Sequence, residues 1–557
     1  MMQQLAFLDI AVFIGYFLIV AGYGWYVYQK RRHAAASTTE YFLAEGSLSW
    51  WAIGASLIAS NISAEQFIGM SGEGFRMGLA VASYEWMAAA TLIIVAVFFM
   101  PVYLENRIFT MPQFLSTRYN STVALIMAIF WLLLYVVVNL TSILFLGALA
   151  ISSISGINIH VCSLLLALFA LVITLGGMRV IGFTDVIQVF FLILGGLATT
   201  YLALLLVAQQ NGESSSWQGF QLLLQHSRDH FHLILPQTHP KFLDMPGLTV
   251  LLGGMWVANF SYWGCNQYIT QRALGADLQT ARSGILFAAF LKLLMPLIVV
   301  LPGIAAYALY QHGNFHNELQ DASGMVMGDK AYPMLLNLLP AGLKGLSFAA
   351  LTAAIVASLA GKANSIATIF TLDIYKKIGD KHANERTLVQ VGKWTVITAL
   401  TIALVIAPYL GIEKGGLKYI QEYTGFVSPG IFAMFLLGLF WRRATSGAAL
   451  FATIGGFLFS VFLKFLPHFT DLSWMSPAGF SKAGQNGVYE IPFLDRMGFV
   501  FLFCVAGMVL ISVFKKQEES TSSGIKVNAS MFGVSNAFLV GSLLIVGILV
   551  ALYSVFW

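Results

Sequence analysis

The most regular feature of the chain is a series of long apolar runs, each separated from the next by a polar segment. Each run has the roughly 20 residues that a helix needs to cross a bilayer. A β-barrel is excluded, because barrel strands alternate apolar and polar residues and these runs do not. The pattern predicts an all-α polytopic membrane protein with about 14 transmembrane helices. They are expected near residues 8–28, 51–72, 81–104, 122–154, 161–177, 181–207, 248–271, 283–311, 344–376, 391–411, 415–441, 447–466, 495–514 and 535–557.

Composition agrees with this prediction. Of the 557 residues, 58% are hydrophobic and only 10% are charged, and the mean hydropathy is +0.79. A soluble domain carries about 25% charged residues, so most of this surface must face lipid. The first apolar run is too long for a signal peptide and lacks a basic leading segment, which predicts a retained helix. Cys162, Cys265 and Cys504 all lie in apolar runs, so no disulfide framework and no cysteine metal site is expected.

The distribution of Lys and Arg predicts the orientation of the spans. With the N-terminus outside, the inner connectors hold roughly twice as many of these residues as the longer outer connectors. Both termini are then expected outside a plasma membrane, of the bacterial inner-membrane type. The His-rich connector 208–247 is predicted to be a solvated outer loop with a short helix, rather than a metal site. The Ser-rich residues 515–523 indicate a flexible inner linker.

Three spans are interrupted by polar or small residues. The interruptions lie in residues 54–72, 253–264 and 421–430. Polar backbone is tolerated at membrane depth only where it is covered by protein or lines a water-filled cavity. The first two interrupted spans are five apart, and an odd offset between equivalent helices reverses their direction. Paired interrupted spans of this kind are typical of the central site of a transporter with inverted repeats.

Among the ionisable residues inside the predicted spans, four stand out: Glu85, Asp185, Lys292 and Lys362. Such residues are functional hypotheses by default, because a charge in hydrocarbon is costly. The alternative is that each one extends to an interface or forms a structural pair. Lys292 lies about nine residues into its span, so its side chain would reach an interface less easily than that of Glu85, which lies only a few residues into its span.

Five sequence motifs resemble a known family. They are residues 61–72 (NISAEQFIGMSG), 82–87 (ASYEWM), 184–189 (TDVIQV), 287–292 (FAAFLK) and 419–425 (YIQEYTG). These long motifs are similar to those of the sodium/solute symporter family, and especially of its bacterial sodium/galactose branch. The resemblance covers nearly the whole chain and implies a LeuT-type core with a five-plus-five inverted repeat. The implied units are an N-terminal helix and inner loop (1–50), a first repeat (51–207), an outer loop (208–247), a second repeat (248–441) and three C-terminal helices (442–557).

The resemblance also implies a sugar site. It is formed by Gln66, Glu85, Asn259, Lys292 and Gln421, with Asn61 nearby. Amides both donate and accept hydrogen bonds, a carboxylate accepts and an ammonium donates, which together suit the hydroxyls of a neutral polyol. A carboxylate substrate would favour an Arg or a bare helix N-terminus instead.

Two gates are implied by the same resemblance. Tyr262, next to Trp263, is expected to stack on the sugar as the inner gate. The outer gate is expected at Met70, Tyr84 and Leu417, where Leu417 stands in place of the family's phenylalanine. Ala88 replaces a serine of the galactose transporter, so a hexose is a safer prediction than galactose alone.

The sodium site implied by the resemblance uses backbone and hydroxyl oxygens, as hard cations prefer. The matching positions are Ala59, Ile62, Ala354, Ala357 and Ser358. Ala357 departs from the close relative, which has a serine there. Asp185 matches an acidic residue at the ion exit. Lys362, one turn after Ser358, is a candidate modulator of ion binding: it either pairs with Asp185 or extends to the inner interface, and its ammonium would compete with sodium or weaken its binding.

The resulting prediction is a sodium-coupled symporter, not an enzyme, that imports a hexose of the galactose or glucose type by alternating access. Its expected ligands are a small neutral sugar and a sodium ion, with no nucleic-acid or obligate protein partner. The open alternatives are another polyol such as myo-inositol, and proton-coupled sugar uptake. A channel would need filter-like repeats or charged rings, and an enzyme would need a constellation such as H-E-x-x-H. Neither pattern occurs in the sequence.

Overall fold

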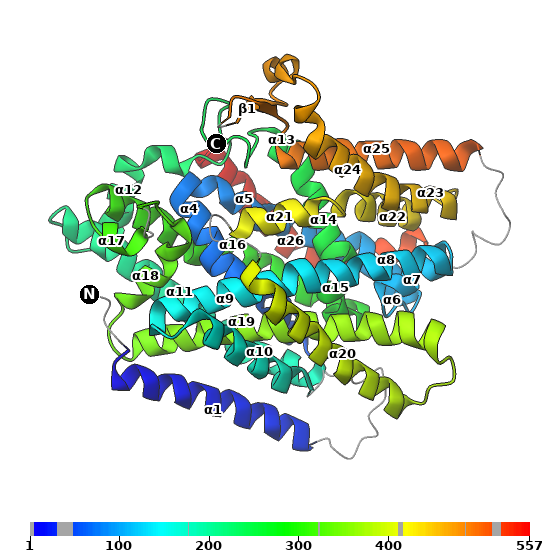
Figure 1. The fold of residues 1–557 in the computed structure, drawn as a ribbon, viewed down its shortest axis with the longest axis horizontal. Coiled ribbons are helices and arrows are strands. Elements are labelled where there is room, and N and C mark those ends of the chain that lie inside the picture. The colour runs from blue at the N-terminus through cyan, green and yellow to red at the C-terminus, as the bar shows by residue number, and fades with distance from the viewer. Residues whose placement is uncertain are drawn as a thin grey trace.

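The computed structural model describes residues 5–30, 48–175, 178–320, 324–409, 416–484, 486–514 and 525–557. Within these ranges the chain is a bundle of long helices that run side by side, across the page in Figure 1. The two strands among the described residues, β1 (Lys482–Ala483) and β2 (Tyr489–Glu490), form one short antiparallel hairpin. The all-α class predicted from the apolar runs is therefore confirmed.

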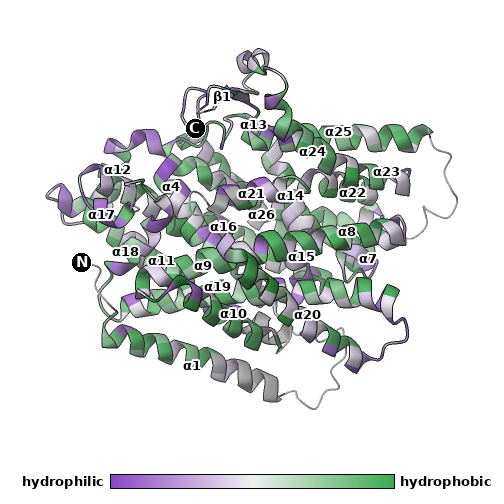
Figure 2. Cartoon of the chain, in the orientation of Figure 1, coloured by the Kyte–Doolittle hydropathy of each residue, from purple (hydrophilic) through white to green (hydrophobic). Residues whose placement is uncertain are grey.

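The fourteen predicted spans all coincide with helix in the described part of the chain. Among the described residues, nine helical stretches are long and apolar enough to cross a membrane, and three shorter apolar helices lie at Phe7–Val20, Ile159–Leu175 and Ser428–Phe440. The two other predicted spans, 51–72 and 248–271, are divided into short helices. Hydrophilic residues gather at the two ends of the bundle, while hydrophobic residues cover its length (Figure 2).

The helices of the first half begin with α1 (Phe7–Lys30), which precedes the first broken span. That span consists of α3 (Trp50–Asn61) and α4 (Ser71–Met77), joined through a π-helical turn over Glu65–Met70. The helices that follow are α5 (Ser83–Ile94), α6 (Met100–Glu105), α7 (Met111–Arg118), α8 (Ser121–Leu133), α9 (Thr141–Ser155), α10 (Ile159–Leu175) and α11 (Met178–Gln210).

The second half begins after the connector 208–247, which contains the predicted short helix, α12 (Ser216–His226). The second broken span consists of α13 (Thr249–Leu252), α14 (Gly254–Cys265) and α15 (Gln267–Leu274). The remaining helices are α16 (Leu278–Gln311), α17 (His316–Leu319), α18 (Ala331–Asn337), α19 (Leu343–Thr368), α20 (Glu385–Ile406), α21 (Gly416–Gly425), α22 (Ser428–Phe440), α23 (Ser446–Leu450), α24 (Gly456–Phe465), α25 (Phe493–Phe514) and α26 (Asn536–Val555).

Polar side chains explain where the broken spans unwind. Helix α3 ends where Ile62 adopts an extended conformation. The amide of Ser63 then donates to the Gln66 side chain at 3.0 Å, and the amide of Glu65 donates to the Ser63 hydroxyl at 3.1 Å. In α14–α15 the break is at Asn266, whose side chain accepts a hydrogen bond from the Tyr268 amide. These bonds satisfy backbone groups that a helix end would otherwise leave unpaired in a dry interior.

Both ends of the described chain lie at the same end of the bundle (Figure 1). Near the N-terminus, the Asp9 carboxylate accepts hydrogen bonds from the amides of Gly342 and Gly345, at the start of α19. At the C-terminus, the carbonyl of Phe556 accepts a 2.8 Å hydrogen bond from the amide of Leu233 in the connector 208–247. The first and last described residues therefore lie at one end of the helix bundle.

Candidate functional site

A cavity lies in the middle of the bundle, where the interrupted spans meet. Ala88 and Lys362 line it. So do most of the predicted substrate and gate residues, namely Asn61, Gln66, Met70, Tyr84, Glu85, Asn259, Tyr262, Trp263, Lys292 and Gln421. The side chain of Leu417 is outside the described residues, although its backbone belongs to α21. The three interrupted spans, of which the first two are five apart in the order of spans, thus meet at one cavity.

Lys292 and Glu85 form an ion pair inside the bundle. The Lys292 ammonium donates to a Glu85 carboxylate oxygen and to the Asn61 carbonyl oxygen, and it lies 5.1 Å from the centre of the Trp263 ring. Lys292 is only 1% exposed and Glu85 is 3% exposed. The alternative that either residue extends to a membrane interface is therefore wrong. The pair presents a strong acceptor and a strong donor to anything that enters the cavity.

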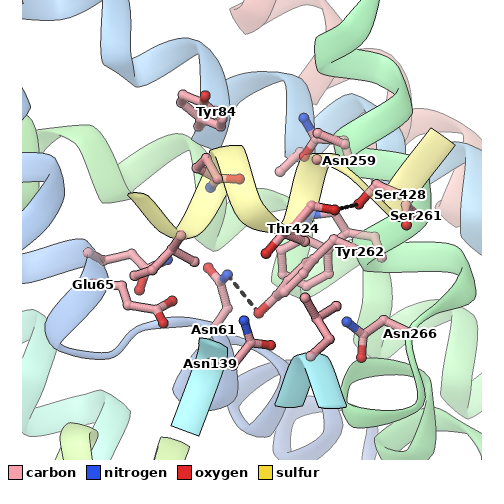
Figure 3. Close-up of a pocket in the computed structure, with 18 of the residues that line it drawn as sticks. Asn61, Glu65, Tyr84, Asn139, Asn259, Ser261, Tyr262, Asn266, Thr424 and Ser428 are labelled. Carbon is pink, nitrogen blue, oxygen red and sulfur yellow. Dashed lines mark hydrogen bonds between the residues drawn. The ribbon is translucent and has the colours of Figure 1, made fainter. Parts of the chain in front are cut away.

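Asn61 connects this ion pair to the predicted inner gate. Its carbonyl oxygen accepts from Lys292, while its NH2 group donates to the Tyr262 hydroxyl at 3.2 Å. Figure 3 shows the Asn61 amide pointing toward the Tyr262 hydroxyl, with Glu65 on the other side. The Tyr262 and Trp263 rings meet edge to face, 5.1 Å apart. The sequence placed Asn61 only near the sugar site, whereas the structure makes it a bridge between two parts of that site.

Two amides of the site are oriented by the backbone next to them. The Gln66 carbonyl oxygen accepts from the Ser63 amide, which directs the NH2 group of Gln66 away from this bond. Asn259 donates from its own NH2 group to the Met255 carbonyl at 3.0 Å. Gln66 thus presents N–H donors to a ligand, and Asn259 presents its carbonyl oxygen and its second N–H. This mixture suits hydroxyls, which donate and accept at once.

Backbone oxygens converge on Ser358 where α3 ends. The Ser358 hydroxyl lies 3.4 Å from the carbonyl oxygen of Ala59, 3.2 Å from that of Ser60 and 3.4 Å from that of Ile62. Ser358 is fully buried on α19, the helix that also carries Ala354 and Ala357. Several oxygen donors around one point are the set that a sodium ion requires. Ser60 was not predicted, although its carbonyl is among the last of α3 and has no partner further along the helix.

The structure corrects the prediction for Lys362. Asp185 accepts a 2.6 Å hydrogen bond from Ser56, and its charged neighbour is Arg272 at 3.9 Å rather than Lys362. Lys362 instead lies 5.3 Å above the Tyr268 ring and lines the central cavity. It is 4% exposed, so extension to the inner interface is wrong as well.

Gly361 explains why Arg272 reaches Asp185. A Cβ atom at position 361 would lie 2.5 Å from the Arg272 guanidinium, so the glycine leaves the space that this side chain fills. The Arg272 guanidinium also lies 4.8 Å from the centre of the Tyr268 ring. Asp185, the predicted ion-exit residue, therefore lies in a cluster with Arg272 and Tyr268. This cluster is next to the oxygens around Ser358.

Lys362 lines the same cavity as one further carboxylate, that of Glu65. Glu65 is buried on the π-helical turn and also lines the cavity. The sequence showed Glu65 inside an interrupted span, but nothing in a single sequence pairs it with a residue almost three hundred positions later. The structure adds Glu65 and Arg272 to the charged residues of the site.

Broken helices that converge on an enclosed polar cavity, next to a cluster of backbone oxygens, define a secondary transporter that binds a small solute and a cation. A family model described as the sodium:solute symporter family matches residues 41–456. The chain belongs to this family. This match confirms the predicted family, and with it the prediction that the protein is a transporter rather than an enzyme.

Individual proteins with known names agree with this assignment. A sodium/glucose cotransporter of Vibrio parahaemolyticus is 46% identical over 561 residues, which cover 99% of each chain. A sodium/myo-inositol cotransporter 2 of Oryctolagus cuniculus is 31% identical and covers 84% of this chain and 71% of its own. The solved structure of a sodium-coupled sialic acid symporter, in a substrate-bound outward-open state, matches 92% of this chain with a TM-score of 0.75 and 20% identity. The last comparison shows a shared fold.

Proposed function

We propose that the protein imports a hexose together with sodium by alternating access. The observation that supports this most is the chain of contacts Glu85–Lys292–Asn61–Tyr262 inside the cavity. It supplies a carboxylate acceptor, an ammonium donor, an amide and an aromatic ring within one enclosed space. Sugars offer hydroxyls to the first three and an apolar C–H face to the ring. The identity to a sodium/glucose cotransporter over the whole chain supports the same substrate class.

The charges of the cavity favour a neutral substrate. Among the described residues that line it, the ionisable side chains of opposite sign are the carboxylates Glu65 and Glu85 and the ammonium groups Lys292 and Lys362. Their charges cancel, so an anionic or cationic substrate would leave an uncompensated charge in a dry site, which costs several kcal/mol, roughly. A polyol introduces no charge.

The choice among neutral polyols is tested by counterflow. Proteoliposomes loaded with unlabelled glucose, galactose or myo-inositol are diluted into trace labelled glucose with sodium on both sides. We expect internal glucose and galactose to drive labelled uptake and myo-inositol to drive little. Ala88 and Leu417 stand where the galactose branch has other residues, so glucose and galactose need not rank equally. A parallel run uses trace labelled myo-inositol: uptake of that tracer, with none of labelled glucose, would replace the hexose with that cyclitol and leave the transporter class intact.

Sodium is proposed to bind between the end of α3 and α19, at the oxygens of Ala59, Ile62, Ala354 and Ser358, with Ser60 added by the structure. Binding there would hold α3 and α19 together and favour the outward-open state. Ala357 supplies no hydroxyl.

One charge crossing ~100 mV releases about 2.3 kcal/mol, and a tenfold sodium gradient adds about 1.4 kcal/mol. At one-to-one stoichiometry these could accumulate sugar several hundredfold, roughly.

The gates are proposed from their positions. Met70 and Tyr84, with Leu417 on α21, would close the cavity toward the outside. Tyr262 and Trp263 would close it toward the inside, and Asp185 would meet the sodium ion as it leaves. Because Asn61 bonds both Lys292 and Tyr262, sugar release and opening of the inner gate are expected to occur together.

The orientation and the division into repeats are also proposals. An outer position for both termini, in a plasma membrane, is supported by the excess of Lys and Arg on the other connectors. Two inverted repeats at 51–207 and 248–441 are supported by the breaks in α3–α4 and α14–α15, which are the second and seventh spans.

Lys362 is proposed to weaken sodium binding, because a buried positive charge near the Ser358 oxygens repels a cation. Lys362→Met is expected to lower the sodium concentration for half-maximal uptake about three- to tenfold, where tenfold corresponds to about 1.4 kcal/mol. Lys344→Met is the matched control, since Lys344 is a buried lysine near the start of the same helix. Uptake is measured against sodium at saturating sugar. An unchanged sodium dependence in Lys362→Met would contradict this role.

A further inference from the structure

Helix α21 brings Gln421 to the cavity but is itself short and separate. It has ten residues, and Phe426 and Val427 divide it from α22, which begins with Ser428 and Pro429. Proline at the first turn of α22 cannot supply an amide to continue the hydrogen bonds of α21. The orientation of α21, and with it the position of the Gln421 amide, must therefore be fixed by contacts with other helices.

The strongest polar contacts of α21 lead to the C-terminal helices. Glu422, the residue after Gln421, accepts hydrogen bonds on one carboxylate oxygen from Arg496 of α25, at 2.7 Å, and from Lys464 of α24. The side chains of Glu422 and Arg496 are 17% and 11% exposed, whereas that of Lys464 is 38% exposed. Because solvent weakens an exposed pair, Arg496 is the more important partner.

Backbone packing joins the same two helices one turn later. A Cβ atom at Gly425 would lie 3.0 Å from the sulfur of Met497, so α25 rests directly against the backbone of α21. Met497 also lines the central cavity, next to residues of the predicted sugar site. Arg496 and Met497 are consecutive, and between them they contact α21 at Glu422 and at Gly425.

Another polar attachment of α21 is weaker. Lys418 lies 2.6 Å from Asp244, in the connector 208–247, and its side chain is 50% exposed. An exposed pair of this kind contributes little, because solvent screens its charges. The partly buried link to α25 therefore holds α21 more firmly than the outer connector does.

We propose that Arg496 is a positioning residue for substrate binding. Through Glu422 it fixes α21 so that Gln421 meets the substrate, which makes α25 part of the binding apparatus although it lies outside the two proposed repeats. This inference rests on the proposed sugar uptake. Arg496 itself does not line the cavity and is not proposed to touch the sugar.

The test is the concentration dependence of sodium-driven glucose uptake into proteoliposomes. Arg496→Met is expected to raise the KM for glucose about tenfold, while the maximal rate and the sodium half-saturation at saturating glucose stay within about twofold. Arg496→Lys, which keeps the charge, is expected to restore most of the affinity. Lys464→Met removes the exposed partner and is expected to raise the KM by less than threefold, roughly.

A double variant separates positioning from simple loss of fold. If Arg496 acts through Glu422, then Glu422→Gln with Arg496→Met should have about the KM of Arg496→Met alone, because both remove one interaction. Independent, multiplied effects would contradict the proposal, and so would an unchanged KM in Arg496→Met. A loss of maximal rate together with a lower melting temperature in detergent, without a change in KM, would mean a structural role only. If the unaltered protein takes up no glucose or galactose, the proposed function fails instead.

Discussion

Replacing Lys292 by methionine is expected to reduce sodium-driven hexose uptake at least about a hundredfold. The Lys292 ammonium contacts both Glu85 and Asn61 in the interior, so its loss leaves the Glu85 carboxylate buried without its partner. Breaking one side of such a pair costs about 3–5 kcal/mol. The same change removes a donor from the cavity and releases Asn61, which holds Tyr262. The measurement is initial uptake of labelled glucose or galactose into proteoliposomes under a sodium gradient.

A double variant distinguishes loss of folding from loss of binding. Glu85→Gln together with Lys292→Met removes both charges of this pair, so this protein is expected to regain the melting temperature of the unaltered transporter. It is still expected to bind little sugar, because a charged donor and a charged acceptor are both missing. Full recovery of uptake in the double variant would contradict the role of Lys292 and Glu85 as substrate ligands. It would make them a structural ion pair.

Removing the Ser358 hydroxyl is expected to raise the sodium concentration for half-maximal uptake at least about tenfold. The hydroxyl lies within 3.4 Å of the carbonyls of Ala59, Ser60 and Ile62, so it is a side-chain oxygen at the proposed ion position. A factor of ten corresponds to about 1.4 kcal/mol of binding free energy. The KM for sugar at saturating sodium should change much less, since Ser358 does not line the sugar cavity.

Two further variants on α19 complete this test. Ala357→Ser adds a hydroxyl one residue earlier and is expected to lower the sodium half-saturation severalfold. Thr352→Val is the matched control, because the Thr352 hydroxyl is buried on the same helix but bonds only its own backbone at Phe348. A shift as large in Thr352→Val as in Ser358→Ala would show that any buried hydroxyl on α19 matters. The oxygen cluster would then not be the sodium site.

Much of the architecture could be predicted because it follows from local sequence. The apolar runs determine the helices, and the polar residues from Asn61 to Gln66 coincide with the break after α3 because they satisfy the unwound backbone locally. The buried positions of Glu85 and Lys292 were also predictable, since a charge deep in an apolar run must face the protein interior. The residues that meet in the cavity came from the resemblance to a family rather than from the pattern itself.

Pairings between distant helices could not be predicted. The sequence suggested Lys362 as a partner for Asp185, whereas the structure places Arg272 beside it, in the space left by Gly361. The contact of Glu422 with Arg496 and the double role of Asn61 likewise depend on how helices pack across long sequence separations. Periodicity and composition describe one helix at a time and carry no information of this kind.

The central claim is that sodium drives the accumulation of a neutral sugar. The most direct measurement compares labelled glucose and galactose uptake into proteoliposomes under inward sodium, potassium and proton gradients of equal size. The account predicts accumulation above the external concentration with sodium, and only equilibration with potassium or protons. Accumulation driven by protons without sodium would contradict sodium coupling and leave Lys362, Glu65 and Asp185 as the groups to examine.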